Sequence, residues 1–273
     1  MNKKIRLDQR VFELGLFESR EKAKAAIMAG VIYVNGKRVD KPGFAISDDS
    51  LVEMHGKAVP YVSRGGLKLE KALRVFPIDI KEKIFIDCGA STGGFTDVLL
   101  QNGAKRVYAV DVGYGQLAWK IRNDPRVVNM ERTNIRYLTY KEIPELLDGA
   151  VMDLAFISIT LALPPVLSLL VQNADIICLI KPQFEAGRDE VGKKGVVRSP
   201  ETHLKVINKI INFAKELNLS VMGLDFSPIK GPEGNIEYLC WLKKGEFVPL
   251  IPIDPKLIVE KSHKLFSDKD KNE

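Results

Sequence analysis

The chain has 273 residues, 45% of them hydrophobic, and a formal net charge of +6 with a pI of about 9.0. This length predicts one large domain and a smaller one, and the basic balance favours a polyanionic partner such as RNA. The three cysteines lie within apolar runs, which argues against a disulfide framework. The amino-terminal stretch lacks the apolar core of a signal peptide, so we expect a cytoplasmic protein. No run reaches the roughly 18 apolar residues of a membrane helix, and no metal-ligand spacing occurs, so we expect neither a membrane nor a metal.

The first part of the chain, residues 1–59, is predicted to form a small domain of its own. Two short helices are expected over 6–14 and 19–29. Ser19 suits the N-cap of the second helix, and Gly30 suits the position just after its end.

A hairpin and a further strand follow these helices. Asn35-Gly36 stands between strand-like runs, which is the strongest short hairpin signal, and another strand is expected over 50–54. This order, in the stretches R-L-D-Q-R and S-R-E-K-A-K-A-A-I-M-A-G-V-I-Y-V-N-G-K-R-V, resembles the S4 RNA-binding domain. The candidate RNA contacts are Arg6, Arg10, Arg20, Lys22, Lys24, Lys37 and, in the next helix, Arg64. The alternative is a solvated charged surface on a small helical cap.

The rest of the chain is predicted to form a larger α/β domain. Residues 60–64 are expected to be a linker, 65–245 the domain itself and 246–273 a polar tail that is frayed after Ile258. A helix with Ser63 as its cap and its last residue at Phe76 should open this domain.

From residue 84 onward, short apolar runs alternate with helical stretches, which is typical of a parallel sheet buried on both faces. Strands are predicted over 84–87, 107–111, 127–130, 150–154 and 175–180. Helices are predicted over 96–103, 117–122, 164–172 and 200–217, and a closing antiparallel pair of strands over 219–226 and 236–243. The predicted fold class is therefore a Rossmann-like α/β sheet, in which ligands lie outside the carboxyl ends of the strands.

A glycine-rich turn, D-C-G-A-S-T-G-G-F-T, follows the first strand. Such a turn before a helix lets backbone N–H groups approach a ligand closely. The glycine spacing differs from the dinucleotide fingerprint, and Asp87 would repel a pyrophosphate but could receive the ammonium of a methionine moiety. S-adenosylmethionine is therefore favoured over NAD. The predicted contacts in the turn are Gly89, Ala90, Ser91, Thr92, Gly93, Gly94 and Phe95.

Two polar residues after the next strands are further candidates for cofactor binding. Asp111 could accept both ribose hydroxyls of a nucleoside, as an acid in this place does in dinucleotide folds, or it could cap a helix. Asn134 could meet the adenine amino group or be an ordinary turn residue.

Charged residues also stand at strand ends around the same predicted cleft. Asp153 ends the fourth strand, Lys181 ends the fifth, and Glu237 begins the last. Lys68 enters from the preceding helix. Each residue alone could be a loop cap or a surface charge, but their joint placement favours a catalytic set.

In order and local context these four residues resemble the K-D-K-E tetrad of FtsJ-like ribose 2′-O-methyltransferases. With the S4-like segment, the stretches S-R-G-G-L-K-L, D-L-A-F-I-S, L-I-K-P-Q-F-E and G-P-E-G-N-I-E-Y resemble the hemolysin A (TlyA) family over roughly residues 5–243. The resemblance implies S-adenosylmethionine-dependent 2′-O-methylation of cytidine in ribosomal RNA, with that RNA or a ribosomal subunit as partner. We expect a monomer.

The residues allow a mechanism in which a ribose hydroxyl loses its proton as it attacks a methyl group. Lys181 is expected to be the base or the cation that stabilises the developing alkoxide, and Asp153 to orient it. Lys68 and Glu237 would position the ribose. The charged, glycine-rich stretch 187–195 could close over RNA or be a solvated loop.

Three other functions compete with this hypothesis. A non-catalytic RNA-binding protein is disfavoured by the complete turn and tetrad, and methyl transfer from labelled cofactor would exclude it. A pore-forming haemolysin, which the family name suggests, lacks an amphipathic hairpin or an apolar span, and a liposome-leakage assay would test it. An NAD-dependent dehydrogenase is disfavoured by the glycine spacing.

Overall fold

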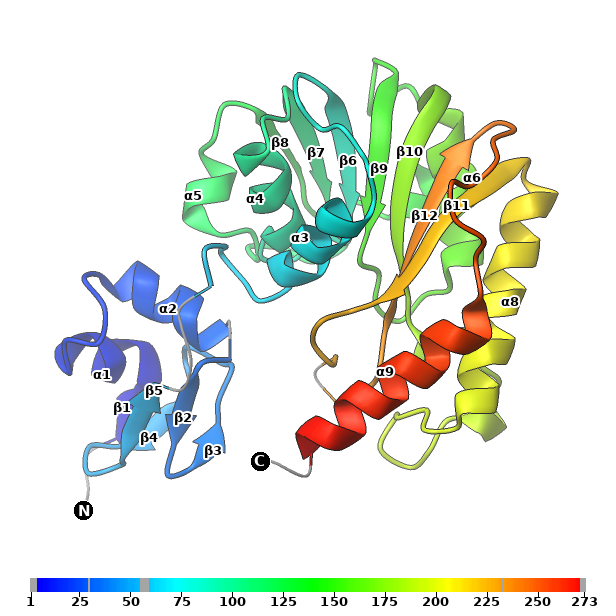
Figure 1. The fold of residues 1–273 in the computed structure, drawn as a ribbon. Helices are drawn as coiled ribbons and strands as arrows, with labels where there is room; N and C mark the ends of the chain where they lie inside the picture. Colours follow the sequence, from blue (N-terminus) through cyan, green and yellow to red (C-terminus); the bar gives the residue numbers. More distant parts are fainter. Residues whose placement is uncertain (1–3, 29, 55–58, 232, 271–273) are drawn as a thin grey trace.

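The computed structural model describes residues 4–28, 30–54, 59–231 and 233–270. A small amino-terminal part, with α1, α2 and β1 to β5, stands beside a large part built on one broad sheet (Figure 1). The segment before α3 leads from one part into the other. The predicted fold class, a Rossmann-like sheet with a small α+β domain before it, is confirmed.

The small part contains the two predicted helices. α1 spans Leu7–Glu13 and α2 spans Arg20–Met28. The backbone N–H of Lys22 donates to the Ser19 hydroxyl at 3.1 Å, so Ser19 caps α2 as predicted. Gly30 has a φ of +72°, the left-handed conformation that glycine favours just past a helix end.

Two small sheets complete this part. β1 pairs with β4, and β2 lies between β3 and β5, all antiparallel. The turn between β2 and β3 is Asn35-Gly36, with φ of +49° and +74°, and is the predicted hairpin. The strands are β1 Lys4–Arg6, β2 Ile32–Val34, β3 Lys37–Arg38, β4 Ala45–Ser47 and β5 Val52–Met54. Leu7, Ile27 and Ile32 are fully buried in a core that belongs to this part alone.

The large part is built on a seven-stranded sheet in the order β11-β12-β10-β9-β6-β7-β8. The five strands from β10 to β8 are parallel, and β12 pairs antiparallel with both β10 and β11, which confirms the predicted closing pair. The strands are β6 Ile84–Cys88, β7 Arg106–Val110, β8 Val127–Met130, β9 Leu147–Met152, β10 Leu170–Ile180, β11 Leu219–Phe226 and β12 Tyr238–Lys244. The chain passes from β6 through β7 to β8 at one edge of the sheet, and β9 then pairs with the other side of β6. The strand order therefore reverses between β6 and β9. In such sheets, ligands bind at the carboxyl ends of the strands at this switch point.

Helices cover both faces of the sheet. Phe85 of β6 belongs to the core beneath α3 and α4, whereas its neighbour Ile86 belongs to the core beneath α6 and α8. The helices are α3 Gly66–Val75, α4 Gly94–Gln101, α5 Trp119–Arg122, η1 Ile135–Tyr137, α6 Ile159–Ser168, α7 Pro182–Glu185, η2 Arg188–Glu190, α8 Pro200–Glu216 and α9 Pro255–Asp270. Burial on both faces explains why the strand sequences are almost continuously apolar.

Two helices begin elsewhere than predicted. α3 begins at Gly66, and Ser63 is not its cap, because the Gly66 N–H donates to the Ser63 carbonyl oxygen at 3.1 Å in a separate turn. α6 begins at Ile159, earlier than predicted, and the end of the predicted helix belongs to β10. The Ser158 hydroxyl caps α6 by accepting from the Thr160 N–H at 3.2 Å, and the two prolines lie inside the helix rather than at its start.

The prediction of a polar, frayed tail is wrong for residues 255–270. They form α9, which packs against α8 and β11 (Figure 1). Val259 and Phe266 are buried in the core beneath α8, and Ser262 between them is fully buried. These three positions make one stripe at helical spacing within an otherwise polar sequence, which composition alone concealed. Neither α9 nor any other helix among the described residues is long and apolar enough to span a membrane.

Candidate active site

Four charged side chains meet at one edge of the sheet. Lys68 Nζ lies 2.7 Å from Glu237 Oε2 and 3.3 Å from Asp153 Oδ2. Lys181 Nζ lies 2.5 Å from Asp153 Oδ1. Acids and bases therefore alternate in one continuous run of ion pairs, and no member exposes more than 18% of its side chain. The structure brings together all four residues of the predicted tetrad.

Each member of this tetrad comes from a different element. Lys68 lies in the first turn of α3, while Asp153 and Lys181 directly follow the parallel neighbours β9 and β10. Glu237 directly precedes β12, which runs antiparallel to β10 and therefore begins at the edge where β10 ends. The fold thus brings Glu237 into contact with Lys68, although the two residues are 169 positions apart in the sequence.

The ion pairs fix the charge of two members. Burial disfavours the charged form of Lys68, but Asp153 and Glu237 outweigh it and raise the pKa of Lys68. Burial also disfavours the charged form of Asp153, but Lys68 and Lys181 together lower the pKa of Asp153 to about 2. Near neutral pH, Lys68 therefore keeps its proton and Asp153 stays ionised, so neither is suited to take a proton from a hydroxyl.

The glycine turn approaches this cluster closely. Gly89 has a φ of +86°, and a Cβ there would lie 2.8 Å from the carbonyl oxygen of Asp153. Gly93, the N-cap of α4, has a φ of +91°, and a Cβ there would lie 3.0 Å from the Leu117 side chain. Both positions therefore require glycine for backbone conformation and for space.

A cavity of about 610 Å³ lies between the turn and the segment that follows β9. Four of the predicted cofactor residues line it: Gly89, Ser91, Asp111 and Asn134. The others, Ala90, Thr92, Gly93, Gly94 and Phe95, do not, and Phe95 is buried in the core. Residues 154–158 form another wall, which the sequence analysis did not assign. The one sequence feature that could have indicated their place at the cavity is their position directly after Asp153.

Asp111 and Asn134 use their side chains to shape the cavity. Asp111 Oδ2 accepts from the Ser91 N–H at 2.8 Å and its Oδ1 accepts from the Gly113 N–H at 2.7 Å. Each oxygen retains acceptor capacity for a hydroxyl, and no helix follows directly, so the N-cap alternative for Asp111 is wrong. Asn134 Oδ1 accepts from the Arg136 N–H at 3.1 Å and caps η1, so it is a turn residue that also lines the cavity.

Asp87 is a fully buried acid at the end of β6. Its Oδ2 accepts from the Thr96 N–H at 2.9 Å and from the Thr96 hydroxyl at 2.6 Å, whereas Oδ1 has no hydrogen-bond partner among the described residues. Burial raises the pKa of Asp87 to about 7, although the bonds from Thr96 oppose the shift. A buried acceptor without a partner is costly, so this oxygen fits a ligand that brings a donor.

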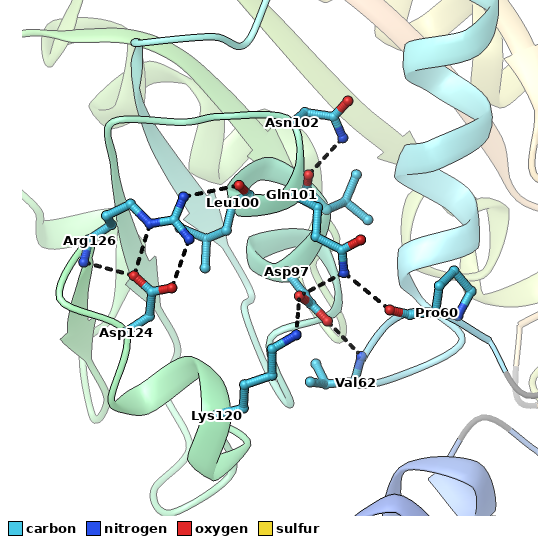
Figure 2. Close-up of polar contacts among 10 residues, drawn as sticks. Pro60, Val62, Asp97, Leu100, Gln101, Asn102, Lys120, Asp124 and Arg126 are labelled. Carbon is cyan, nitrogen blue, oxygen red and sulfur yellow. Dashed lines mark hydrogen bonds and ion pairs between the residues drawn. The ribbon is translucent and has the colours of Figure 1, made fainter.

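The linker to the small domain is fixed to α4, the helix that follows the glycine turn. Asp97 accepts from the Val62 N–H at 2.9 Å, and the Gln101 amide donates to the Pro60 carbonyl oxygen at 3.1 Å (Figure 2). Lys120 Nζ lies 3.3 Å from Asp97 Oδ1 (Figure 2). Asp97 is almost fully buried, so these groups replace its water. This contact could not be predicted from the sequence, because backbone donors carry no sequence pattern.

Two of the candidate RNA contacts in the small domain share one buried acid. Asp8 is fully buried and lies 3.0 Å from Arg6 Nε and 2.9 Å from Arg20 Nη2. Burial opposes ionisation of this acid, but the two arginines lower the pKa of Asp8 below its ordinary value. The arginine side chains still expose 54% and 40% of their surfaces, so they can hold the domain together and meet phosphates at the same time.

The remaining candidate RNA contacts are spread more widely. Arg10 donates to a backbone carbonyl at 2.9 Å, and Lys22 pairs with a glutamate one turn earlier in the chain. Lys24 is half-buried on α2, and Lys37 is exposed on β3. Arg64 is half-buried just before α3, close to the tetrad. The structure therefore places these residues on both domains rather than in one compact group.

Comparison with known families matches both parts of the chain. The S4 domain matches residues 5–52, and the FtsJ-like methyltransferase matches residues 61–244. The chain belongs to the FtsJ-like methyltransferase family. The resemblances drawn from the sequence are thereby confirmed, and with them the assignment of the protein as a methyltransferase.

Relatives from this family share the whole domain order. YqxC of Bacillus subtilis is 52% identical over 276 residues, which cover 98% of this chain and 97% of that protein. The 16S/23S rRNA (cytidine-2′-O)-methyltransferase TlyA of Mycobacterium tuberculosis is 44% identical over 244 residues, covering 89% and 91%. A solved hemolysin structure from Streptococcus thermophilus is 47% identical with a TM-score of 0.79, and the match covers 99% of this chain and 100% of that one.

Proposed function

We propose that the protein transfers a methyl group from S-adenosylmethionine to the ribose 2′-hydroxyl of cytidine in ribosomal RNA. The observation that carries this proposal is the buried run of ion pairs through Glu237, Lys68, Asp153 and Lys181, beside the glycine-turn cavity. The similarity to TlyA, which is named for this reaction, supports the choice of substrate.

The cavity fits S-adenosylmethionine in its donors and acceptors. Asp111 lines this cavity and offers two acceptors for the ribose hydroxyls. Asp87 does not line it, but this fully buried acid lies just before the glycine turn and has an unpartnered oxygen for the amino group. Gly89 allows close approach, and Asn134 lines the wall where the adenine edge would lie. When bound, the cofactor supplies an electrophilic methyl group.

Lys181 is the member of the tetrad left to handle the proton of the attacking hydroxyl. Lys68 keeps its own proton, and Asp153, with a pKa of about 2, is too weak a base. Glu237 exposes only 1% of its side chain and is held by Lys68 at 2.7 Å. Lys181 takes the proton or, as a cation, stabilises the alkoxide, while Asp153 at 2.5 Å orients it. Lys68 and Glu237 position the ribose at the other end of the run. Holding both reactants in line supplies much of the rate.

The small domain supplies affinity for the RNA in this proposal. Arg6, Arg20 and Lys37 present partly or fully exposed cations that can neutralise phosphates. Arg64 stands between this surface and the tetrad, where the backbone next to the target nucleotide would pass. The partner is therefore ribosomal RNA or a ribosomal subunit, recognised by one domain and modified by the other.

The test is methyl transfer to ribosomal subunits from cells that lack this protein. Purified protein and tritiated S-adenosylmethionine should label one or both subunits, and mapping should place the label on cytidine 2′-oxygens. The Lys181→Ala variant is the matched control and should give no label. Label on a base, or none on either subunit with active protein and intact cofactor, would reject the proposal.

A further inference from the structure

The two segments that carry Asp153 and Lys181 run side by side beyond the sheet. Asp153 opens residues 153–158, directly after β9, and Lys181 opens residues 181–185, directly after β10. Three contacts join the segments, in chain order: Lys181 with Asp153 at 2.5 Å, Phe184 with Phe156 at 5.3 Å between ring centroids, and Glu185 with Ser158 at 2.7 Å. The last contact lies at the far end of both segments, away from the ion pair.

Glu185 makes that far contact with both of its oxygens. Its Oε2 accepts from the Ser158 hydroxyl and its Oε1 accepts from the Ile159 N–H, each at 2.7 Å. The side chain exposes only 1% of its surface, and Lys209 Nζ lies 3.3 Å from Oε2. A buried carboxylate with these partners fixes the first turn of α6, where residues 153–158 end.

Within this segment Leu154 and Ile157 pack on the core beneath α6 and α8, whereas Phe156 between them does not. Phe156 exposes 92% of its surface and has a φ of +64°, a conformation that non-glycine residues rarely adopt. Such a segment needs anchors at both ends to keep one conformation. Asp153 at one end is anchored by Lys68 and Lys181, and Ser158 at the other end by Glu185.

We propose that Glu185 is a positioning residue for methyl transfer. It holds residues 153–158 in register with residues 181–185, so that Asp153 stays on Lys181 and the cavity wall formed by 154–158 keeps its shape. Glu185 acts through these segments and does not line the cavity itself. This inference rests on the proposed function, because it assigns Lys181 and Asp153 to the reaction.

The test compares two variants of Glu185 in the full-length protein. Glu185→Ala should lower kcat by about 10- to 100-fold, because displacements near 1 Å cost rates of this order, and should change KM for the RNA by less than about twofold. It should also weaken binding of S-adenosylhomocysteine, since 154–158 line the cavity. In Glu185→Gln the amide oxygen can still accept from the Ile159 N–H, and the amide NH2 group can donate to the Ser158 hydroxyl oxygen, so kcat should stay within about threefold of the native value.

Two controls separate positioning from loss of stability. Lys209→Met removes the ion pair to the Glu185 carboxylate and the hydrogen bond to the Glu185 carbonyl oxygen, but it leaves the bonds to α6, so kcat should be nearly unchanged. Ile207→Val, within the core beneath α8, should lower the unfolding temperature without lowering kcat. Hydrogen exchange gives a readout that does not depend on activity: the amide of Ile159 should lose protection in Glu185→Ala and keep it in Ile207→Val.

The outcomes are distinct for the inference and for the proposed function. If the native protein methylates RNA but Glu185→Ala has native kcat, or loses no more activity than Ile207→Val at matched stability, Glu185 has no positioning role. If the native protein itself transfers no methyl group to ribosomal subunits, the proposed function fails instead, and the hydrogen-exchange result still reports whether Glu185 holds the segment.

Discussion

The small and the large domain each bury one aspartate completely, but the two aspartates differ in their partners and in the direction of their pKa shifts. Asp8 in the small domain receives two arginines, which lower its pKa despite burial. Asp87 in the large domain has no cation beside it among the described residues, keeps one oxygen without a partner, and has a pKa raised to about 7. The two arginines satisfy both oxygens of Asp8 within the small domain, whereas Asp87 keeps one buried oxygen that a ligand could use.

The same distinction applies to the ion pairs of the two domains. Arg6 and Arg20 meet Asp8 with much of their surface in solvent, so water and salt weaken their interaction. Lys68, Lys181 and Glu237 are almost fully withdrawn from water. We therefore expect substitutions in the tetrad to have large effects on catalysis and stability, and those on the S4 surface to have small effects that depend on salt.

The largest expected effect is on catalysis. Lys181→Ala removes the residue placed to handle the hydroxyl proton and should lower kcat by about 10²- to 10⁴-fold, the usual contribution of such a group. RNA binding, measured by filter retention, should be nearly unchanged because one lysine is a small part of the footprint.

Lys181→Arg then tests the role of this residue. Arginine keeps the charge but cannot act as a base at ordinary pH. Activity retained in Lys181→Arg would assign Lys181 to charge stabilisation, whereas loss equal to that of alanine is expected for proton transfer. Native turnover in Lys181→Ala would remove Lys181 from the mechanism.

The next largest expected effect is a difference between the two kinds of ion pair in their contribution to the free energy of unfolding. Lys68→Met leaves Glu237 buried without its cation, since Glu237 exposes only 1% of its side chain. The large domain should therefore lose about 3–5 kcal/mol of unfolding free energy. Arg6→Ala leaves Asp8 with Arg20 and should lower the unfolding free energy of the small domain far less, because the lost pair was half exposed. Denaturant unfolding measures both. Equal losses would show that burial does not distinguish the two clusters.

Cofactor binding should depend on pH through Asp87. Its pKa of about 7 in the free protein means that acidification from pH 8 to pH 6 protonates the carboxyl group and removes the charge that an ammonium group prefers. Affinity for S-adenosylhomocysteine should fall about 10-fold over this range, which corresponds to the change in ionised fraction. Calorimetry at several pH values measures it, and Asp87→Asn should bind weakly with little pH dependence. A flat profile for the native protein would contradict the role of Asp87.

The smallest expected effect concerns the S4 surface. The double variant Lys24→Ala, Lys37→Ala removes two cations and leaves every buried acid with its partners. Removal of Arg6 and Arg20 together would instead leave the buried Asp8 without a cation. RNA affinity should fall modestly, and the slope of log K against log salt should flatten by about 0.7–0.9 for each phosphate that is no longer neutralised. Activity at saturating RNA should be native. An unchanged slope would mean that these lysines do not contact phosphates.

The sequence predicted the elements whose signals are local. Apolar runs indicated the parallel strands, Asn35-Gly36 indicated the hairpin, and the residues at strand ends indicated the tetrad, because parallel strands deliver their carboxyl ends to one edge. It did not predict α9, whose apolar stripe is sparse, or the start of α6, where prolines suggested a later first turn. Asp8, Asp97 and Glu185 were also missed, since a buried acid is recognised by its partners and these come from distant segments or from the backbone.

The ion pair between Lys68 and Glu237 also has a consequence for the order in which the protein folds. The small domain is closed by contacts among its first 54 residues, so a growing chain can complete it early. The tetrad joins residues 169 positions apart and cannot form until β10 and β12 have paired. In the proposed function, the chain during synthesis therefore completes its RNA-binding domain well before its catalytic site.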